Sequence, residues 1–216
     1  MKKLFRFVLL PALALLSLTP AFADPVTLQV TVNTTPIAGS SGYLAFDFLG
    51  GSPPQGNTAT VSGFVTTGTL GASSTSGNVS GTLTSPPVVL TTSVFFNEFL
   101  QGITFGSLTT FDLTLSSNFL TGSTPDSFSF FLLDNTFTPF PTSDPTGANA
   151  LFVIDIDNAR MPVVFTSSSA TATVSQVAGA VPEPATMLLL GSGLAGLTAF
   201  RLRKLRRREG KRGCGP

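Results

Sequence analysis

Side chains able to do acid–base or nucleophilic chemistry are scarce in this chain of 216 residues. There is no His, and no Lys occurs between Lys3 and Lys204. A histidine base, a lysine nucleophile and a histidine-ligated metal are therefore excluded from the middle of the chain. Cys214 is the single Cys and lies past the last basic cluster, so an intrachain disulfide is excluded as well.

Glu98 is the remaining candidate for catalysis. It stands beside Phe96 and Phe99, and apolar neighbours raise the pKa of a carboxyl group toward that of a general acid. Glycoside hydrolysis needs a second carboxyl group within about 5 to 9.5 Å, and the flanking sequence supplies none. The sequence therefore predicts a glutamate at the surface or in an edge turn, and a protein that is not an enzyme.

Asp155 and Asp157, followed by Asn158, match part of a calcium-binding loop, but its Gly and its closing Glu are absent. Asp134 and Asp144 would join them only if loops brought the side chains together. We expect no cofactor. A structural calcium ion at Asp155 and Asp157 stays open, because β-sandwich modules often hold one on such loops.

A carbohydrate-binding module is an alternative function. Protein faces that bind sugars usually present Trp or Tyr, and this chain has no Trp and a single Tyr, Tyr43. Tyr43 follows Gly42 at the head of an alternating segment, where a position at the rim of the core is the simpler expectation.

The elements that must position these residues are predicted to be strands. Four segments alternate apolar and polar residues with the period of two of a strand buried on one face: 26–33, 44–48, 111–116 and 170–174. Two runs are apolar at successive positions, as in central strands: 128–133 and 151–156. Twenty Phe residues supply apolar bulk for a core.

Weaker patterns predict further strands at 58–66, 79–84, 88–92 and 102–105. Turns are predicted where Gly, Pro, Ser and Thr gather, at 50–54, 71–77, 122–125 and 138–147, and residues 97–101 fit one helical turn. Many short strands at this spacing favour an all-β domain built as an antiparallel β-sandwich, with the jelly roll as one topology.

Charge is distributed unevenly along the chain. Residues 24–181 hold nine acidic residues and one basic residue, Arg160, a net charge of −8, although the whole chain has +1. Neutralising phosphates needs Lys and Arg, so nucleic acid is excluded as a partner. The negative charge keeps a β-rich domain soluble and apart from its copies.

The N-terminal segment has the three parts of a secretory signal peptide. Its basic residues are Lys2, Lys3 and Arg6, its apolar core is 7–18, and Ala21 and Ala23 occupy the −3 and −1 positions of a cleavage site. An apolar core of this length covers about 18 Å, well short of the roughly 30 Å hydrocarbon core of a bilayer. The sequence therefore predicts a signal peptide at 1–23 and export through the general secretion machinery.

Residues 185–200 carry no charge and are rich in Gly and Leu, which predicts one C-terminal transmembrane helix. A basic stop-transfer cluster follows, made of Arg201, Arg203, Lys204, Arg206, Arg207 and Arg208. Such clusters stay on the cytoplasmic side, so residues 24–183 are predicted to lie outside. A permanently anchored single-pass surface protein is the alternative, but it leaves the prolines before the helix unexplained.

Those prolines belong to the segment Val181, Pro182, Glu183 and Pro184. This segment, the short helix and the Arg cluster occur in the order of the PEP-CTERM sorting signal of Gram-negative bacteria, which the last 35 or so residues resemble. Residues 209–216 depart from it by running past the cluster. The resemblance implies that exosortase, a membrane-embedded Cys protease or transpeptidase, recognises Pro182, Glu183 and Pro184 and removes the tail. The helix is then a transient anchor in the inner membrane.

The resemblance further implies an exported structural protein of the cell surface or of the extracellular matrix of a biofilm, with extracellular polysaccharide as a further partner. The expected organisation has five parts. These are the signal peptide 1–23, a β-sandwich domain 24–176, a linker 177–184 with the Pro-Glu-Pro motif, the helix 185–200 and a basic cytoplasmic tail 201–216.

Overall fold

The computed structural model describes residues 25–177 except 117, 120 and 158. The predicted signal peptide, Pro-Glu-Pro motif, transmembrane helix and basic tail lie outside these residues. Within the described part of the chain, no helix is long and apolar enough to cross a membrane.

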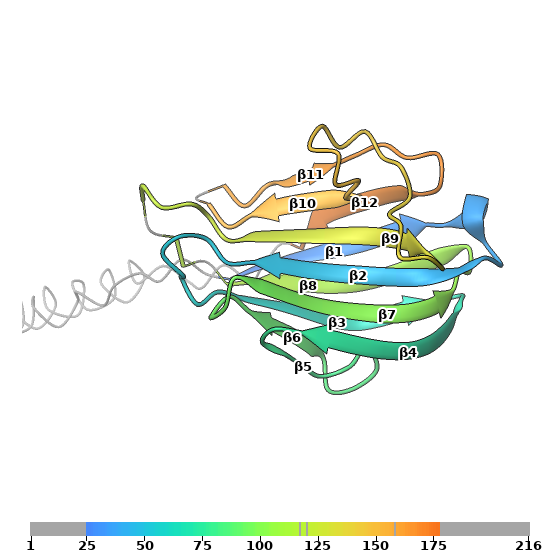
Figure 1. Ribbon diagram of the computed structural model, residues 1–216, viewed down its shortest axis with the longest axis horizontal. Coiled ribbons are helices and arrows are strands. Elements are labelled where there is room, and N and C mark those ends of the chain that lie inside the picture. The colour runs from blue at the N-terminus through green and yellow to red at the C-terminus, as the bar shows by residue number, and fades with distance from the viewer. Residues whose placement is uncertain (1–24, 117, 120, 158, 178–216) are drawn as a thin grey trace, which may run out of the picture. The chain divides into compact units, whose positions relative to one another are not determined.

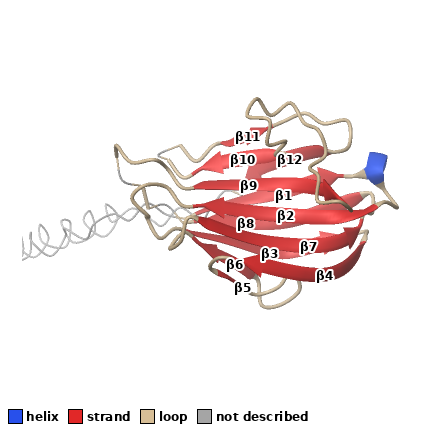
Figure 2. Ribbon diagram, in the orientation of Figure 1, coloured by secondary structure: helices blue, strands red, loops and turns tan. Residues whose placement is uncertain are grey.

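The described residues form two antiparallel sheets of six strands each (Figures 1 and 2). The first sheet has the order β12 (Thr171–Gln176), β1 (Val26–Asn33), β8 (Leu108–Leu115), β3 (Thr58–Thr66), β6 (Val88–Thr91) and β5 (Val79–Ser80). The second has the order β11 (Pro162–Val164), β10 (Phe152–Asp155), β9 (Ser127–Asp134), β2 (Ser41–Leu49), β7 (Phe96–Thr104) and β4 (Thr69–Ser76). A 3-10 helix, η1 (Thr35–Ile37), connects β1 and β2. The predicted all-β class is confirmed.

The two sheets share one core because their strands turn apolar side chains toward each other. Phe46 of β2 packs against Phe130 of β9 in its own sheet and against Phe111 of β8 in the other sheet. The ring centroids lie 5.0 and 5.4 Å apart in tilted and edge-on arrangements, which suit the charge distribution of aromatic rings. All three rings are buried, so the abundant Phe does line the interior.

Several strands coincide with the predicted segments. Strands β1 and β3 have the predicted bounds, and the segments 44–48 and 128–133 lie within β2 and β9. The predicted strand 79–84 shortens to β5, of two residues.

Two predictions of local structure are wrong. Residues 97–101 are not a helical turn but the middle of β7, where Phe99 is buried in the core. Residues 71–77 are not a turn but mostly strand β4, which pairs with β7 at the edge of the second sheet. An edge strand exposed to water needs no apolar side, so β4 lacks the alternation by which strands are recognised.

The chain enters and leaves the domain at one end, because Leu28 near the start of β1 pairs with Gln176 at the end of β12. At the opposite end, backbone hydrogen bonds connect the segment between β1 and β2 to the segment between β7 and β8. Thr34 N–H donates to the Ser107 carbonyl oxygen, and Gly39 N–H donates to the Phe105 carbonyl oxygen. Strand β2 begins and β7 ends at this opposite end, which lies toward η1 in Figure 1.

Candidate functional site

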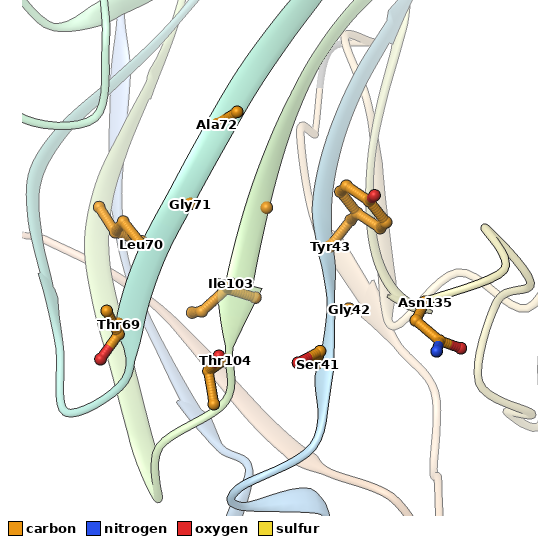
Figure 3. A pocket seen from close by; sticks show the side chains of 11 residues that line it. Ser41, Gly42, Tyr43, Thr69, Leu70, Gly71, Ala72, Ile103, Thr104 and Asn135 are labelled. Atoms are coloured by element: carbon orange, nitrogen blue, oxygen red, sulfur yellow. The ribbon is translucent and has the colours of Figure 1, made fainter.

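A groove of about 420 Å³ lies on the second sheet, at the end where β2 begins and β7 ends (Figure 3). It is lined by residues 41–43 of β2, 69–72 of β4, 102–104 of β7 and Asn135. Figure 3 shows these residues spread over three neighbouring strands, with Asn135 on the loop after β9. Sites for small molecules have volumes of about 300 to 1,000 Å³, so this groove, which we call the Tyr43 groove, is of suitable size.

Three neighbouring residues that line the Tyr43 groove have little or no side chain. Tyr43 pairs with Gly102 across β2 and β7, and Gly71 and Ala72 of β4 lie beside Gly102. A β-carbon on Gly71 would meet the backbone of Gly102 at 3.5 Å, an ordinary contact. A β-carbon on Gly102 would come within 3.0 Å of the Ala72 carbonyl oxygen. These three residues, which we call the floor, therefore carry no side chain larger than a methyl group, and the Gln101 amide donates hydrogen bonds to the carbonyl oxygens of Gly71 and Gly102.

Phe137 supports Tyr43 from the loop that also carries Asn135. The rings of Tyr43 and Phe137 stack with centroids 4.4 Å apart and an interplanar angle of 18°. The Phe137 side chain is 57% exposed, and its backbone has φ of 63°, in the left-handed region that favours Gly or Asn. The fold thus holds an exposed aromatic ring at a backbone position that costs free energy.

Asp134 fixes the start of this loop. Its Oδ1 accepts hydrogen bonds from the side chain and backbone N–H of Thr136 and from the backbone N–H of Thr138. The bond from the Thr136 side chain, followed by that from the Thr138 backbone, lowers the pKa of Asp134. This carboxyl group is therefore ionised at neutral pH, and its hydrogen bonds bracket Phe137.

The structure places Tyr43 on the outer face of β2 rather than at the rim of the core. It is half-buried and stands between Gly42 and Leu44, whose positions face inward. A β-carbon on Gly42 would meet the Leu133 carbonyl oxygen at 2.1 Å and the Phe105 ring at 2.7 Å, so close packing on the inner side requires glycine there.

Glu98 is the third residue of β7, so it lies in a strand and not in an edge turn. It is half-buried and pairs with Asp47 of β2, so the two side chains share one face of the sheet. Burial, followed by the charge of Glu98, raises the pKa of Asp47 to about 7. Burial also raises the pKa of Glu98. The second carboxyl group that the flanking sequence lacks is thus supplied by a strand 51 positions away.

A separate polar cluster, buried at the end where the chain enters, centres on Asp126. Its Oδ1 accepts a hydrogen bond from Gly51 N–H, and its Oδ2 accepts bonds from Asn57 Nδ2 and from the Thr92 hydroxyl. The Asp126, Asn57 and Thr92 side chains are 0% exposed. Because all three donors come from segments distant in the sequence, this cluster stabilises the loops at that end. Sequence patterns gave no signal for it.

The residues proposed for calcium do not converge. Asp155 pairs with Ser127 at the start of β9, whereas Asp134 is at its far end. Asp157 Oδ1 accepts hydrogen bonds from the backbone N–H groups of Ala159 and Arg160. Within residues 25–177, apart from the three omitted positions, no three His, Cys, Asp or Glu residues gather as metal ligands. Calcium at Asp155 and Asp157 stays a prediction.

The predicted cleavage residues Ala21 and Ala23, the motif 181–184 and the basic cluster from Arg201 to Arg208 lie outside the described residues. Searches among curated proteins and among solved structures found no match to this chain. Residues 180–204 match the family model described as the PEP-CTERM protein-sorting motif. This range includes the Pro-Glu-Pro segment, the apolar segment and the first basic residues. The chain therefore carries a PEP-CTERM sorting motif, which indicates an exported protein that exosortase processes at the membrane.

Proposed function

We propose that this protein is a structural component of the cell surface or biofilm matrix of a Gram-negative bacterium. In this proposal the signal peptide 1–23 directs export and is removed after Ala23. The helix 185–200 then holds the protein transiently in the inner membrane, with the basic tail in the cytoplasm. Exosortase acts at the segment 181–184 and releases the β-domain outward.

The observation that carries this proposal is the match to the sorting motif at 180–204, directly after a β-domain whose last strand ends at Gln176. Pro182 and Pro184 lack the backbone N–H that helices and sheets use for hydrogen bonding. The sequence therefore favours an extended segment, which a membrane enzyme can reach. A permanent anchor needs no such segment.

We infer a jelly-roll β-sandwich for the exported domain, and two strand orders support it. The first sheet contains the run β1–β8–β3–β6, and the second contains β2–β7–β4. Successive strands therefore alternate between the sheets from β1 to β4, as they do when a long antiparallel hairpin folds across two sheets. Strands β9 to β12 extend the sheets beyond β2 and β1.

A role other than catalysis is supported by the chemistry of the domain. Residues 24–181 contain no His, Lys or Cys, so a histidine base and a lysine or cysteine nucleophile are absent from this part of the sequence. We propose no cofactor, with a structural calcium ion at Asp155 and Asp157 as the alternative. Comparing the thermal unfolding of the protein with and without a chelator tests that alternative, and an unchanged midpoint argues against it.

Deleting residues 181–184 tests the proposed function. In cells that carry exosortase, we expect the variant to keep its C-terminal segment and to accumulate in the membrane fraction. A deletion of residues 209–216, which lie outside the matched range, is the control and should be processed like the natural chain. Unchanged processing of the 181–184 deletion would favour a permanent single-pass anchor instead.

A further inference from the structure

We propose that the Tyr43 groove binds the pyranose rings of a neutral polysaccharide. This inference deepens the proposed function, from which it takes the setting at the cell surface or matrix, and it names the class of polymer and the site. The groove lies at the end of the domain opposite to the one through which the chain leaves.

The shape of the groove suits a sugar ring. A pyranose is a flat disc with C–H groups on its faces and hydroxyl groups around its edge. The floor at Gly71, Ala72 and Gly102 carries no side chain larger than a methyl group, and Tyr43 borders it with an aromatic ring. Aromatic rings attract apolar C–H surface, and the small floor residues leave room for a sugar ring beside Tyr43.

The polar residues that line the groove carry no charge. Ser41, Thr69 and Thr104 provide hydroxyl groups and Asn135 provides an amide, all of which can both donate and accept hydrogen bonds. A neutral sugar presents the same kind of group in return. A binding site for a phosphate or carboxylate would need Lys or Arg, and neither occurs among the lining residues.

Charge further restricts the polymer. Asp134, next to Asn135, is held in its ionised form by its hydrogen bonds, and residues 24–181 have a net charge of −8. An anionic polysaccharide would be repelled both at the groove and by the domain as a whole. A neutral polysaccharide is repelled neither at the groove nor by the net charge of the domain.

The conformation of Phe137 is a second, independent sign of a binding surface. An exposed aromatic side chain at φ of 63° is unfavourable in solvation and in backbone energy, and Gly would fit the turn better. A functional reason for this position is that the Phe137 ring fixes Tyr43 in one orientation by stacking on it. A preformed aromatic surface loses less entropy when a ligand binds. Phe137 is thus a positioning residue for Tyr43.

The test is a binding measurement on the purified full chain, in a detergent without a sugar headgroup. Cellohexaose, maltohexaose and mannohexaose serve as neutral probes, and hexaguluronate serves as the anionic probe. We expect saturable binding of at least one neutral probe and weaker or no binding of hexaguluronate. No binding of any neutral probe, or tighter binding of hexaguluronate, would overturn the proposal.

Two variants locate the binding. Tyr43→Ala removes the aromatic ring, and Gly71→Leu fills the floor with a side chain whose first carbon has room. Each should weaken binding about tenfold or more, whereas Tyr43→Phe, which keeps the ring, should stay within about threefold. Ser76→Leu makes the same kind of change at an exposed site on β4 outside the groove and should bind like the natural chain. Binding that survives both Tyr43→Ala and Gly71→Leu would place the sugar elsewhere.

The binding assay needs neither exosortase nor processing, so the two proposals fail separately. A chain that is sorted but binds no neutral probe keeps the proposed function and loses this inference. A chain that binds a neutral probe but keeps its tail in cells with exosortase supports this inference and contradicts the proposed function.

Discussion

Asp47 of β2 and Glu98 of β7 are paired across the second sheet and place two carboxyl groups side by side on one face of it. Asp47 Oδ1 is buried and has no hydrogen-bond partner among the described residues. Burial and the neighbouring charge raise the pKa of Asp47 from 3.8 to about 7. The folded protein therefore keeps a proton that the unfolded chain releases near pH 4.

This difference in proton binding predicts a stability that falls as the pH rises. Below about pH 4 the folded and unfolded states both hold the Asp47 proton, and between pH 4 and 7 only the unfolded state loses it, which favours unfolding. The loss is at most about 4 kcal/mol and is complete above about pH 7. Urea unfolding at pH 4.5, 6 and 8 measures it. Asp47→Asn should reduce this dependence to the part contributed by Glu98, whose pKa burial also raises, and should be more stable than the natural chain at pH 8.

Asp155→Asn is the control for this experiment, because Asp155 is exposed at the end of β10. It should keep the pH dependence of the natural chain. Asp134 has a lowered pKa, so its contribution to the stability of the fold is lost as the pH falls and not as it rises. This loss occurs below about pH 4, outside the measured range. An unchanged slope in Asp47→Asn would show that the Asp47 proton is not the cause.

The strained backbone at Phe137 predicts an unusual order of stability among substitutions. Phe137→Ala and Phe137→Gly both remove the stacked ring, but only Gly relieves the left-handed conformation. We expect Phe137→Gly to be more stable than Phe137→Ala by about 1 kcal/mol in urea unfolding. Equal stability, or a more stable Ala variant, would mean that the backbone is not strained there.

Removal of the buried Asp126 carboxylate should cost far more than removal of an exposed one. Asp126→Ala leaves the Gly51 N–H, the Asn57 amide and the Thr92 hydroxyl without their buried acceptor. We expect a loss of about 3 to 5 kcal/mol in the free energy of unfolding. Asp155→Ala, at an exposed site, should stay within about 0.5 kcal/mol. Similar values for both variants would argue against a stabilising role of the cluster.

Gly42 and Gly71 both border the Tyr43 groove but should respond differently to a methyl group. A β-carbon on Gly42 has only 2.1 Å to the Leu133 carbonyl oxygen, whereas one on Gly71 has 3.5 Å to Gly102. We expect Gly42→Ala to lose about 2 kcal/mol or more, and Gly71→Ala to stay within about 1 kcal/mol. Thermal unfolding of the two variants side by side measures the contrast, and equal midpoints would contradict it.

Strands buried on one side could be predicted from the sequence because burial leaves a period of two. Strand β1 follows this rule and has the predicted bounds. Strand β4 does not, because all its side chains except Leu70 are exposed. A different reason applies to residues 97–101 of β7: the buried positions Asn97 and Gln101 are polar, so the alternation in burial does not show as an alternation of apolar and polar residues.

The residue pairs on the outer face of the second sheet could not be predicted from the sequence, because predicting them requires the register between strands. Asp47 and Glu98 are 51 positions apart, and Tyr43 and Phe137 are 94 positions apart, so no local pattern connects either pair. A shift of β2 against β7 by one residue would turn Asp47 into the core and separate the carboxyl groups. The sorting motif, by contrast, is a linear segment and could be recognised without the fold.

The intact mass of the mature protein tests the central claim most directly. The protein is purified from cells with exosortase and from otherwise identical cells without it, and both samples are measured by mass spectrometry. We predict that the first sample begins at Asp24 and lacks residues 201–216, and that the second retains them. A mature protein that keeps residues 201–216 in cells with exosortase would contradict the account.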